Sequence, residues 1–234
     1  MDHNGTNKTI SIVIPALNEE EGIQVTMKAI PRDELETMGY QVQVLVVDNN
    51  SEDATAELAR KAGADVVLEK RRGYGRAYKT GFACAKGDII LTADADDTYP
   101  IEDFTRLVEI LEKENLDFLT TNRFASMAED AMAFRNRFGN AILSLTMRIL
   151  FGLKIKDSQS GMWAFRRSIL DNLVLRSDNA PLSQELKIEA CHFAKCRWRE
   201  VPIRYKPRVA KPKLGGWGVG FENLLHLFKK RIAR

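Results

Sequence analysis

Four short runs of β-branched residues, several followed by a segment with helical spacing, constrain the fold of this chain more than any other feature. The runs occupy residues 10–15, 42–48, 65–69 and 88–94, and helical patterns cover 54–64 and 101–114. Strand and helix therefore alternate along residues 10–114. This alternation predicts an α/β fold with a mainly parallel, Rossmann-like sheet, helices on both faces, and ligands at the carboxyl ends of the strands.

Length and composition are those of one large domain. The chain has 234 residues, of which 44% are apolar, enough for a sizeable core. We expect an N-terminal tail over 1–9, a catalytic domain over 10–214, and a C-terminal Gly-rich loop with an amphipathic helix over 215–234. No apolar run reaches the roughly 20 residues of a membrane-spanning helix, and the three cysteines lack metal or disulfide spacing. We therefore expect a soluble or peripheral protein of a reducing compartment.

Charge is unevenly distributed although the formal net charge is only +3. Carboxylates concentrate before residue 120, whereas "KCRWREVPIRYKPRVAKPKL" is strongly basic. This asymmetry indicates an anionic partner, either a phosphate or an acidic membrane surface. In the C-terminal helix, Trp217 and Phe221 would be apolar anchors at such a surface. Docking of this helix against the protein's own core accounts equally well for its pattern.

Polar loops follow three of the predicted strands. They are "PALNEEEG" after the first, "DNNSEDAT" after the second and the aspartate cluster of "LTADADDTYP" after the fourth. Asp48 ends the second strand directly, so we expect its carboxylate to face the crevice. There is no GxGxxG after the first strand and no P-loop. The glycines and arginines of "RRGYGRAYKTGF" are compatible with phosphate contact or with an ordinary helix start.

The aspartate cluster predicts a metal site. In an extended segment Asp94 and Asp96 would lie on one side, with the small Ala95 between them admitting a ligand close to the backbone. Two such carboxylates suit Mg²⁺ or Mn²⁺, which keeps part of its shell for water and substrate phosphates. A solvated loop is the simpler alternative, and capping of a helix near Ile101 would account for Asp97.

Eight motifs, in order along the chain, resemble those of a known family. They are "SIVIPALNEEEGI", "VLVVDNNSEDAT", "RRGYGRAYKTGF", "DADDTYP", "TTNRF", "RNRFGNAILS", "DSQSGMWAFRR" and "EVPIRYKPRVAKPKL". Together they are similar to the family 2 glycosyltransferases of GT-A fold, and more narrowly to the dolichyl-phosphate or polyprenyl-phosphate hexose synthases, over residues 10–215. The chain departs from these relatives at Thr98, Met162, Trp163 and Pro212, which leaves the sugar donor open.

The resemblance implies that a hexose moves from a UDP- or GDP-sugar to dolichyl or polyprenyl phosphate, with inversion at the anomeric carbon. It implies a nucleoside site, a site for Mg²⁺ or Mn²⁺ and the diphosphate, and cations that contact the phosphates. The residues carried over are, for the nucleoside, Pro15, Leu17, Glu19 and Asp48; for the metal and diphosphate, Asp94 and Asp96 with Ala95; and for the phosphates, Arg123, Arg208 and Lys213.

The expected acceptor decides whether a base is needed. A lipid phosphate is already anionic at neutral pH, so it needs cations, and the resemblance offers Arg135 and Arg137 beside Arg123. A hydroxyl acceptor on a glycan, lipid or small molecule would instead require Asp157 or Glu185 as a base. We expect peripheral action on the cytoplasmic face of a membrane, with room for a membrane-anchoring partner subunit and no role for nucleic acid.

Two functions of other classes remain as alternatives. A catalytically silent sugar-nucleotide binding protein is disfavoured by the intact pair Asp94 and Asp96. A sugar-1-phosphate nucleotidyltransferase shares the expected sheet, but its first strand should be followed by a Gly-rich loop containing Arg, where this chain has "PALNEEEG".

Overall fold

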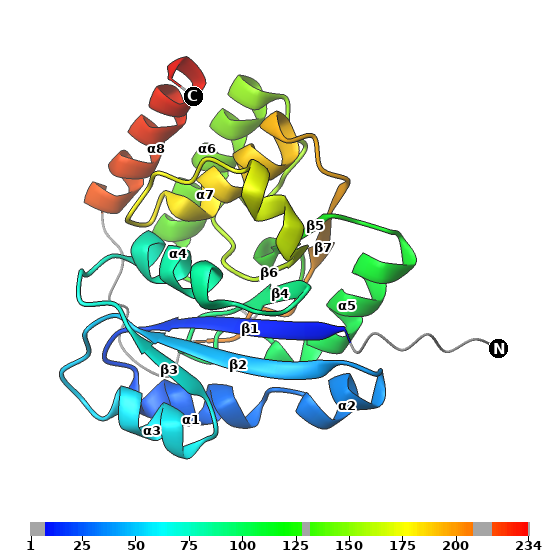
Figure 1. The fold of residues 1–234 in the computed structure, drawn as a ribbon. Helices are drawn as coiled ribbons and strands as arrows, with labels where there is room; N and C mark the ends of the chain where they lie inside the picture. The colour runs from blue at the N-terminus through cyan, green and yellow to red at the C-terminus, as the bar shows by residue number, and fades with distance from the viewer. Residues whose placement is uncertain (1–7, 128–131, 208–216, 234) are drawn as a thin grey trace.

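A seven-stranded sheet forms the centre of the molecule in the computed structural model, which describes residues 8–127, 132–207 and 217–233 (Figure 1). The strand order is β3-β2-β1-β4-β6-β5-β7, and β6 alone of these strands runs antiparallel to its neighbours β4 and β5. The α/β fold with a mainly parallel sheet is thus confirmed. The strands are β1 (Thr9–Ala16), β2 (Gln41–Asp48), β3 (Asp65–Leu68), β4 (Ile89–Thr92), β5 (Phe118–Asn122), β6 (Trp163–Arg166) and β7 (Trp198–Pro202).

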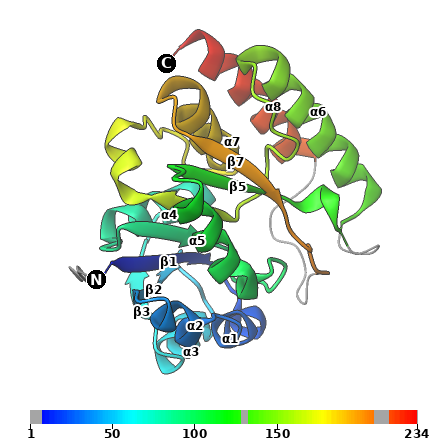
Figure 2. The same cartoon turned by 90° about the vertical axis from the view of Figure 1, so that its right-hand side faces the viewer.

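Helices cover both faces of this sheet, as the sequence predicts (Figures 1 and 2). The α-helices are α1 (Glu20–Lys28), α2 (Arg32–Thr37), α3 (Thr55–Lys61), α4 (Tyr74–Cys84), α5 (Phe104–Lys113), α6 (Phe134–Phe151), α7 (Leu182–Lys187) and α8 (Trp217–Ile232). The 3₁₀ turns are η1 (Ile101–Asp103), η2 (Arg123–Ala125) and η3 (Arg167–Asn172), and the π-helical segment η4 (Ile188–Phe193) continues α7.

The alternation of side chains along the strands divides the interior into two cores. In β1, Ile12 and Ile14 belong to the core shared with α1, α2, α3 and α5, whereas Val13 belongs to the core shared with α4, α6, α7 and α8. Both faces of β1 are buried, which explains why Ile12 to Ala16 form an apolar run and do not alternate with polar residues.

The register of the parallel strands brings the predicted polar loops to one edge. Ala16 at the end of β1 pairs with Asp48 at the end of β2, and Val13 pairs with Thr92 at the end of β4. The loops that follow these three strands therefore start side by side. The predicted meeting of the three polar loops at the carboxyl edge is confirmed.

The C-terminal helix α8 lies beside α6, with one side against the protein and the other exposed (Figures 1 and 2). Leu227 of α8 is fully buried in the core, while Phe221 is 68% exposed. The predicted docking of this helix against the protein's own core is confirmed for one side, and its contact with a membrane stays a prediction. Among the described helices, none has the length and apolar content required to cross a membrane. The division of the chain at residues 9 and 214 stays a prediction.

Candidate functional site

A cavity of about 400 Å³ opens at the carboxyl edge of the sheet. Loops after β1, β2 and β4 supply one part of its wall, and α4, the turn before α7, and the first turns of α8 supply the rest. Its lining residues are Pro15, Ala16, Leu17, Glu19, Asn49, Arg72, Gly73, Tyr74, Ala77, Asp94, Ala95, Asp96, Asn179, Ala180, Val219 and Glu222. Six of the residues carried over for the donor and metal are among them.

The two predicted metal ligands, Asp94 and Asp96, line this cavity together, but they do not lie in the extended segment that we predicted. Strand β4 ends at Thr92, and the chain turns at Ala95 and Asp96, so extended alternation does not place the carboxylates. The turn is fixed by side chains instead. Asp96 Oδ1 accepts hydrogen bonds from the backbone N–H and hydroxyl of Thr98, at 3.2 and 2.7 Å. The expectation that both carboxylates face one space is met by a different geometry.

Phenol groups from α4 approach the other carboxylate. Tyr74 and Tyr78 donate to Asp94 Oδ1 at 3.3 and 3.5 Å. Burial raises the pKa of both phenols well above 10, and the Asp94 charge raises it further. Both phenols therefore stay neutral donors at physiological pH. Their weak hydrogen bonds orient Asp94 without cancelling the negative charge that a cation requires.

The loop after β1 approaches the aspartate turn closely because α1 begins with a glycine in its first turn. A Cβ atom on Gly22 would lie 2.5 Å from the carbonyl oxygen of Ala95, so a larger residue would displace one of the two segments. Glu19 is held nearby, since its backbone N–H donates to Thr55 Oγ1 at 2.7 Å. Gly22 thus permits the predicted nucleoside and metal loops to share one cavity.

Asp48 lies at the end of β2, as predicted, but it is not among the cavity-lining residues. Its Oδ1 accepts the backbone N–H of Ser51 at 3.1 Å, and its neighbour Asn49 lines the cavity. Asn49 Oδ1 accepts the N–H of Gly73 at 2.7 Å, which ties the loop after β2 to the start of α4. The role of Asp48 toward a nucleoside stays a prediction.

The residues present fit a divalent cation that shares its coordination with substrate. Within the described parts of the chain, no group of three or more His, Cys, Asp or Glu side chains is placed to hold a metal ion. Asp94 and Asp96 supply two carboxylates on one cavity wall. That small donor set is typical of Mg²⁺ or Mn²⁺ bound mainly through substrate phosphates, and unlike that of a closed structural site.

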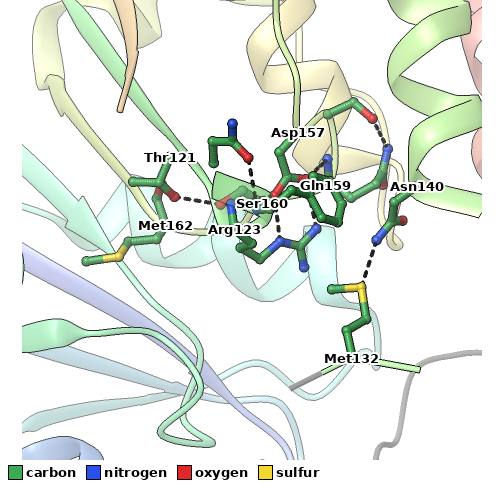
Figure 3. A network of polar contacts seen from close by, with 12 residues as sticks. Thr121, Arg123, Met132, Asn140, Asp157, Gln159, Ser160 and Met162 are labelled. Carbon is green, nitrogen blue, oxygen red and sulfur yellow. Dashed lines mark hydrogen bonds and ion pairs between the residues drawn. The ribbon is translucent and has the colours of Figure 1, made fainter. Parts of the chain in front are cut away.

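Arg123 and Asp157 form a buried ion pair, shown in Figure 3. The guanidinium donates from Nε to Asp157 Oδ2 at 2.7 Å and from Nη2 to Oδ1 at 2.9 Å. It also lies 5.3 Å from the ring centroid of Tyr205. Burial alone would raise the pKa of Asp157, but the Arg123 charge outweighs it and the pKa is lowered. Arg123 contacts Asp157, Phe124 and Tyr205 and is not among the cavity-lining residues, and its predicted approach to phosphates stays a prediction.

A buried lysine of α7 holds the loop from Asp157 to Gly161 in place. Lys187 of α7 donates to the carbonyl oxygens of Ser158 and Ser160, at 3.0 and 2.7 Å. From β5, Thr121 contacts the Ser160 hydroxyl, as Figure 3 also shows. Burial lowers the pKa of Lys187 to about 7, although Asp157 acts in the opposite direction. No pattern in the sequence indicates that this lysine lies inside the protein.

Glu185, the second predicted base, is also committed to an ion pair. Its Oε1 lies 2.8 Å from Lys230 Nζ of α8, and its Oε2 accepts the backbone N–H groups of Arg176 and Ser177. Burial acts to raise its pKa, but hydrogen bonds with His226, Lys230 and Ser177 lower the pKa to about 2. Lys230 also pairs with Glu189 at 2.7 Å. Glu185 therefore ties α8 to α7.

The other predicted cations lie elsewhere. Arg135 and Arg137 are exposed in the first turn of α6, and neither lines the cavity. Arg208 and Lys213 fall outside the described residues. The structure adds Asn49, Arg72, Tyr74, Asn179 and Glu222 to the site. The arginines of "RRGYGRAYKTGF" indicated Arg72, whereas no local pattern marks Tyr74, Asn179 or Glu222.

Comparison with known proteins agrees with this geometry. The family model described as glycosyl transferase family 2 matches residues 11–174. The dolichyl-phosphate hexose transferase of Haloferax volcanii is 32% identical over 215 residues, covering 90% of this chain and 90% of that protein. The low-salt glycan biosynthesis hexosyltransferase Agl6 of the same organism is 29% identical and covers 92% of this chain. This chain spans only 52% of the length of Agl6.

Among solved structures, the fold is similar to that of glucosyl-3-phosphoglycerate synthase from Mycobacterium tuberculosis. The TM-score is 0.74 at 23% identity, with 96% of this chain and 80% of that chain covered. That structure is a complex with Mn²⁺, uridine diphosphate and glucosyl-3-phosphoglycerate. The likeness supports the GT-A fold.

Proposed function

We propose that this chain, which belongs to the glycosyl transferase family 2, transfers a hexose from a nucleotide diphosphate sugar to dolichyl or polyprenyl phosphate with inversion at the anomeric carbon. Its family membership makes it a glycosyltransferase. The donor, the acceptor and the use of a metal are the proposal. A relative that matches 90% of this chain and 90% of its own length is named dolichyl-phosphate hexose transferase, which supports the proposed acceptor.

One observation carries the proposal. Asp94 and Asp96 share a cavity with the β1 loop residues Pro15, Leu17 and Glu19, at the carboxyl edge of a mainly parallel sheet. This edge is where α/β sheets bind nucleotides. A nucleoside beside the β1 loop would place its diphosphate toward the two carboxylates. Bound Mg²⁺ or Mn²⁺ would neutralise the charge that develops on the departing nucleoside diphosphate.

The proposed reaction forms one bond and breaks one bond. An oxygen of the acceptor phosphate attacks the anomeric carbon as the bond from that carbon to the diphosphate oxygen breaks. The electron pair leaves with the nucleoside diphosphate, and attack from the opposite side inverts the anomeric carbon. No proton has to be removed from the acceptor, because a phosphate monoester is anionic at neutral pH. This chain's residues need only bind, align and exclude water.

The state of the two candidate bases supports a phosphate acceptor over a hydroxyl. The pKa of Asp157 is lowered by Arg123, and that of Glu185 lies at about 2. A general base works best with a pKa near the operating pH. A carboxylate already in an ion pair has little tendency to take the proton of a hydroxyl. The hydroxyl acceptor, our alternative, therefore lacks a favourable base among these two groups.

A polyprenyl phosphate resides in a membrane, so we further propose that the protein works peripherally on the cytoplasmic membrane face. A membrane-anchoring partner subunit is compatible with that placement. The free thiols Cys84, Cys191 and Cys196 support a reducing compartment.

The test is direct transfer. Purified protein is incubated with UDP- and GDP-hexoses, Mn²⁺ and a short-chain polyprenyl phosphate, and lipid-linked product is identified by mass spectrometry. We expect one donor to give a hexosyl phosphate lipid. Transfer to a glycan hydroxyl, with none to the lipid phosphate from any donor, would replace the proposal by its alternative. The variant Asp94→Asn, which removes a proposed ligand, serves as the inactive control.

A further inference from the structure

Helix α6 carries a continuous apolar stripe on its exposed side. Phe134, Phe138, Ile142, Leu145 and Ile149 are spaced by three or four residues, so they share one side of the helix. Phe134 is 82% exposed and Ile149 is 74% exposed. The opposite side of α6, with Leu143, Met147 and Phe151, is buried in the core. The stripe is therefore additional to the apolar surface that this helix needs for folding.

Helix α8 repeats the arrangement. Phe221, Leu225, Phe228 and Ile232 are again spaced by three or four residues, and Ile232 is 86% exposed. Leu227 and Lys230 on the other side are buried. Helices α6 and α8 lie side by side at one end of the molecule (Figures 1 and 2). Nine large apolar side chains thus gather on two neighbouring helices, which we call the α6/α8 face.

The charges on this face have one sign. Helix α6 contains Arg135, Arg137 and Arg148 and no Asp or Glu, and all three arginines are exposed. In α8 the exposed Lys229 and Arg231 flank the last part of the stripe. The acidic residue of α8 is Glu222, which lines the cavity. An apolar surface bordered by cations is complementary to an anionic lipid bilayer.

We propose that the α6/α8 face docks on an anionic lipid membrane. Apolar patches of this extent on soluble proteins mark interaction sites. A second copy of the chain is a poorer occupant, because two identical faces would bring their cations together. A bilayer accepts both features at once, since the stripes enter the headgroup region while the arginines and lysines contact lipid phosphates.

The same face lies next to the candidate active site. Val219 and Glu222 in the first turns of α8 line the cavity, whereas Phe221 between them is exposed. A membrane bound at Phe221 would therefore lie within one helical turn of the cavity wall. This step rests on the proposed function: a lipid phosphate could enter from the bilayer with its chain still in the membrane.

Vesicle binding tests the proposal without relying on activity. Full-length protein is sedimented with vesicles of phosphatidylcholine alone or mixed with phosphatidylglycerol, neither containing polyprenyl phosphate. We expect at least about tenfold tighter binding to the anionic vesicles, weakened by salt. Two double variants, Phe138→Ser with Ile149→Ser and Phe228→Ser with Ile232→Ser, should each reduce this binding by about tenfold. The matched control is Val25→Ser with Leu68→Ser, which removes exposed apolar side chains from α1 and β3.

The outcomes are distinguishable from failure of the proposed function. Equal vesicle binding by the wild type and both α6/α8 variants would overturn the membrane proposal. Absence of wild-type binding to either kind of vesicle would also overturn it and would favour a protein partner. A dimer in analytical ultracentrifugation that the same variants dissociate would assign the face to a second copy. With a water-soluble prenyl phosphate the variants should retain wild-type transfer, and with a long-chain acceptor in vesicles they should lose it. If the protein binds vesicles but transfers hexose to neither acceptor, the proposed function is wrong and the proposal of a membrane-binding α6/α8 face is retained.

Discussion

Replacing Glu185 by glutamine should destabilise the fold without removing the chemistry. The carboxylate holds Lys230 at 2.8 Å and accepts two backbone N–H groups, which joins α8 to α7 and to the segment before it. The amide of glutamine keeps the size of the side chain but not its charge. Lys230 would retain Glu189 as a partner at 2.7 Å. The variant therefore removes one of two anions facing a buried cation.

The pKa of Glu185 gives the magnitude. Its pKa falls from 4.5 to about 2 on folding, a difference of about 2.5. At about 1.4 kcal/mol for each pKa unit, the ionised group contributes about 3.5 kcal/mol to the free energy of unfolding. This agrees with the lower end of the roughly 3–5 kcal/mol lost when a buried ion pair is broken. Because Lys230 keeps its contact with Glu189 in the variant, we expect the loss in the free energy of unfolding to lie at the lower end of that range.

The sign of the pH dependence follows from the lowered pKa. Below pH 4.5 the unfolded chain binds a proton that the folded chain does not, so the stabilisation is complete above pH 4.5 and is lost as the pH falls toward 2. At pH 3 about half of it should remain. The difference in stability between wild type and Glu185→Gln should shrink in the same window.

Urea unfolding followed by Trp fluorescence at pH 7, 5, 4 and 3 measures this difference. The control Glu57→Gln breaks an exposed i,i+4 pair with Lys61 and should leave the midpoint unchanged. Sugar transfer per folded molecule should stay near wild type. An unchanged urea midpoint at pH 7 would refute the structural role, and a loss of transfer of about 10²–10⁴-fold in fully folded protein would make Glu185 a base.

Three further predictions concern the other buried and cavity charges. The free energy of unfolding of the wild type should rise between pH 7 and 10.5, because only the unfolded chain holds the Lys187 proton in that window, and Lys187→Met should remove this rise. Urea midpoints measured across the window test this, and the same pH dependence in wild type and variant would contradict it. Asp96→Asn should abolish the Mn²⁺ dependence of nucleotide binding, measured by calorimetry against Asp103→Asn, and retained dependence would move the metal elsewhere. Asp157→Asn should cost about 3–5 kcal/mol, because Arg123 stays buried without its anion, yet should keep transfer to a prenyl phosphate within about tenfold; collapse of transfer in folded protein would support a base.

The sequence was sufficient to predict the sheet edge and six of the sixteen residues that line the cavity. The strands β1, β2 and β4 are mostly apolar, and polar residues lie at the end of β2 and within two residues after β1 and β4, so their loops had to meet once the strands paired in parallel. Strand β6 shows the limit of this reasoning. It has four residues, Trp163–Arg166, and its antiparallel place between β4 and β5 depends on pairing partners far along the chain. No local pattern encodes that pairing.

Contributions from distant segments explain the missed site residues. Asn179 reaches the cavity because the turn before α7 is bound to α4, where Asp178 pairs with Arg76 and Lys79. Glu222 of α8 lies beside it, since Asn179 Nδ2 donates to Glu222 Oε1 at 3.3 Å. Gly73 and Gly75 record that packing, since a Cβ atom on either would lie within 2.6 Å of backbone at Ser177 or Asp178. The closely spaced glycines of "RRGYGRAYKTGF" thus have a packing role, whatever contact the neighbouring Arg72 makes with phosphate.

A charged residue type alone does not distinguish a catalytic residue from one whose ion pair holds a loop in place. Lysine and glutamate are almost never fully buried without a partner, so a sequence reader places them on the surface or in an active site. Here Asp157, Glu185 and Lys187 are all buried, and their partners come from η2, α8 and the loop after α6, respectively. The pairing of Glu185 with Lys230 joins α7 to α8, whose first turns line the cavity. A carboxylate in such a pair has its pKa lowered and its orientation fixed, which suits it to hold a loop in place and makes it a poor proton acceptor. The two residues that sequence reasoning selected as bases are therefore the ones whose surroundings argue most directly for an acceptor that needs none.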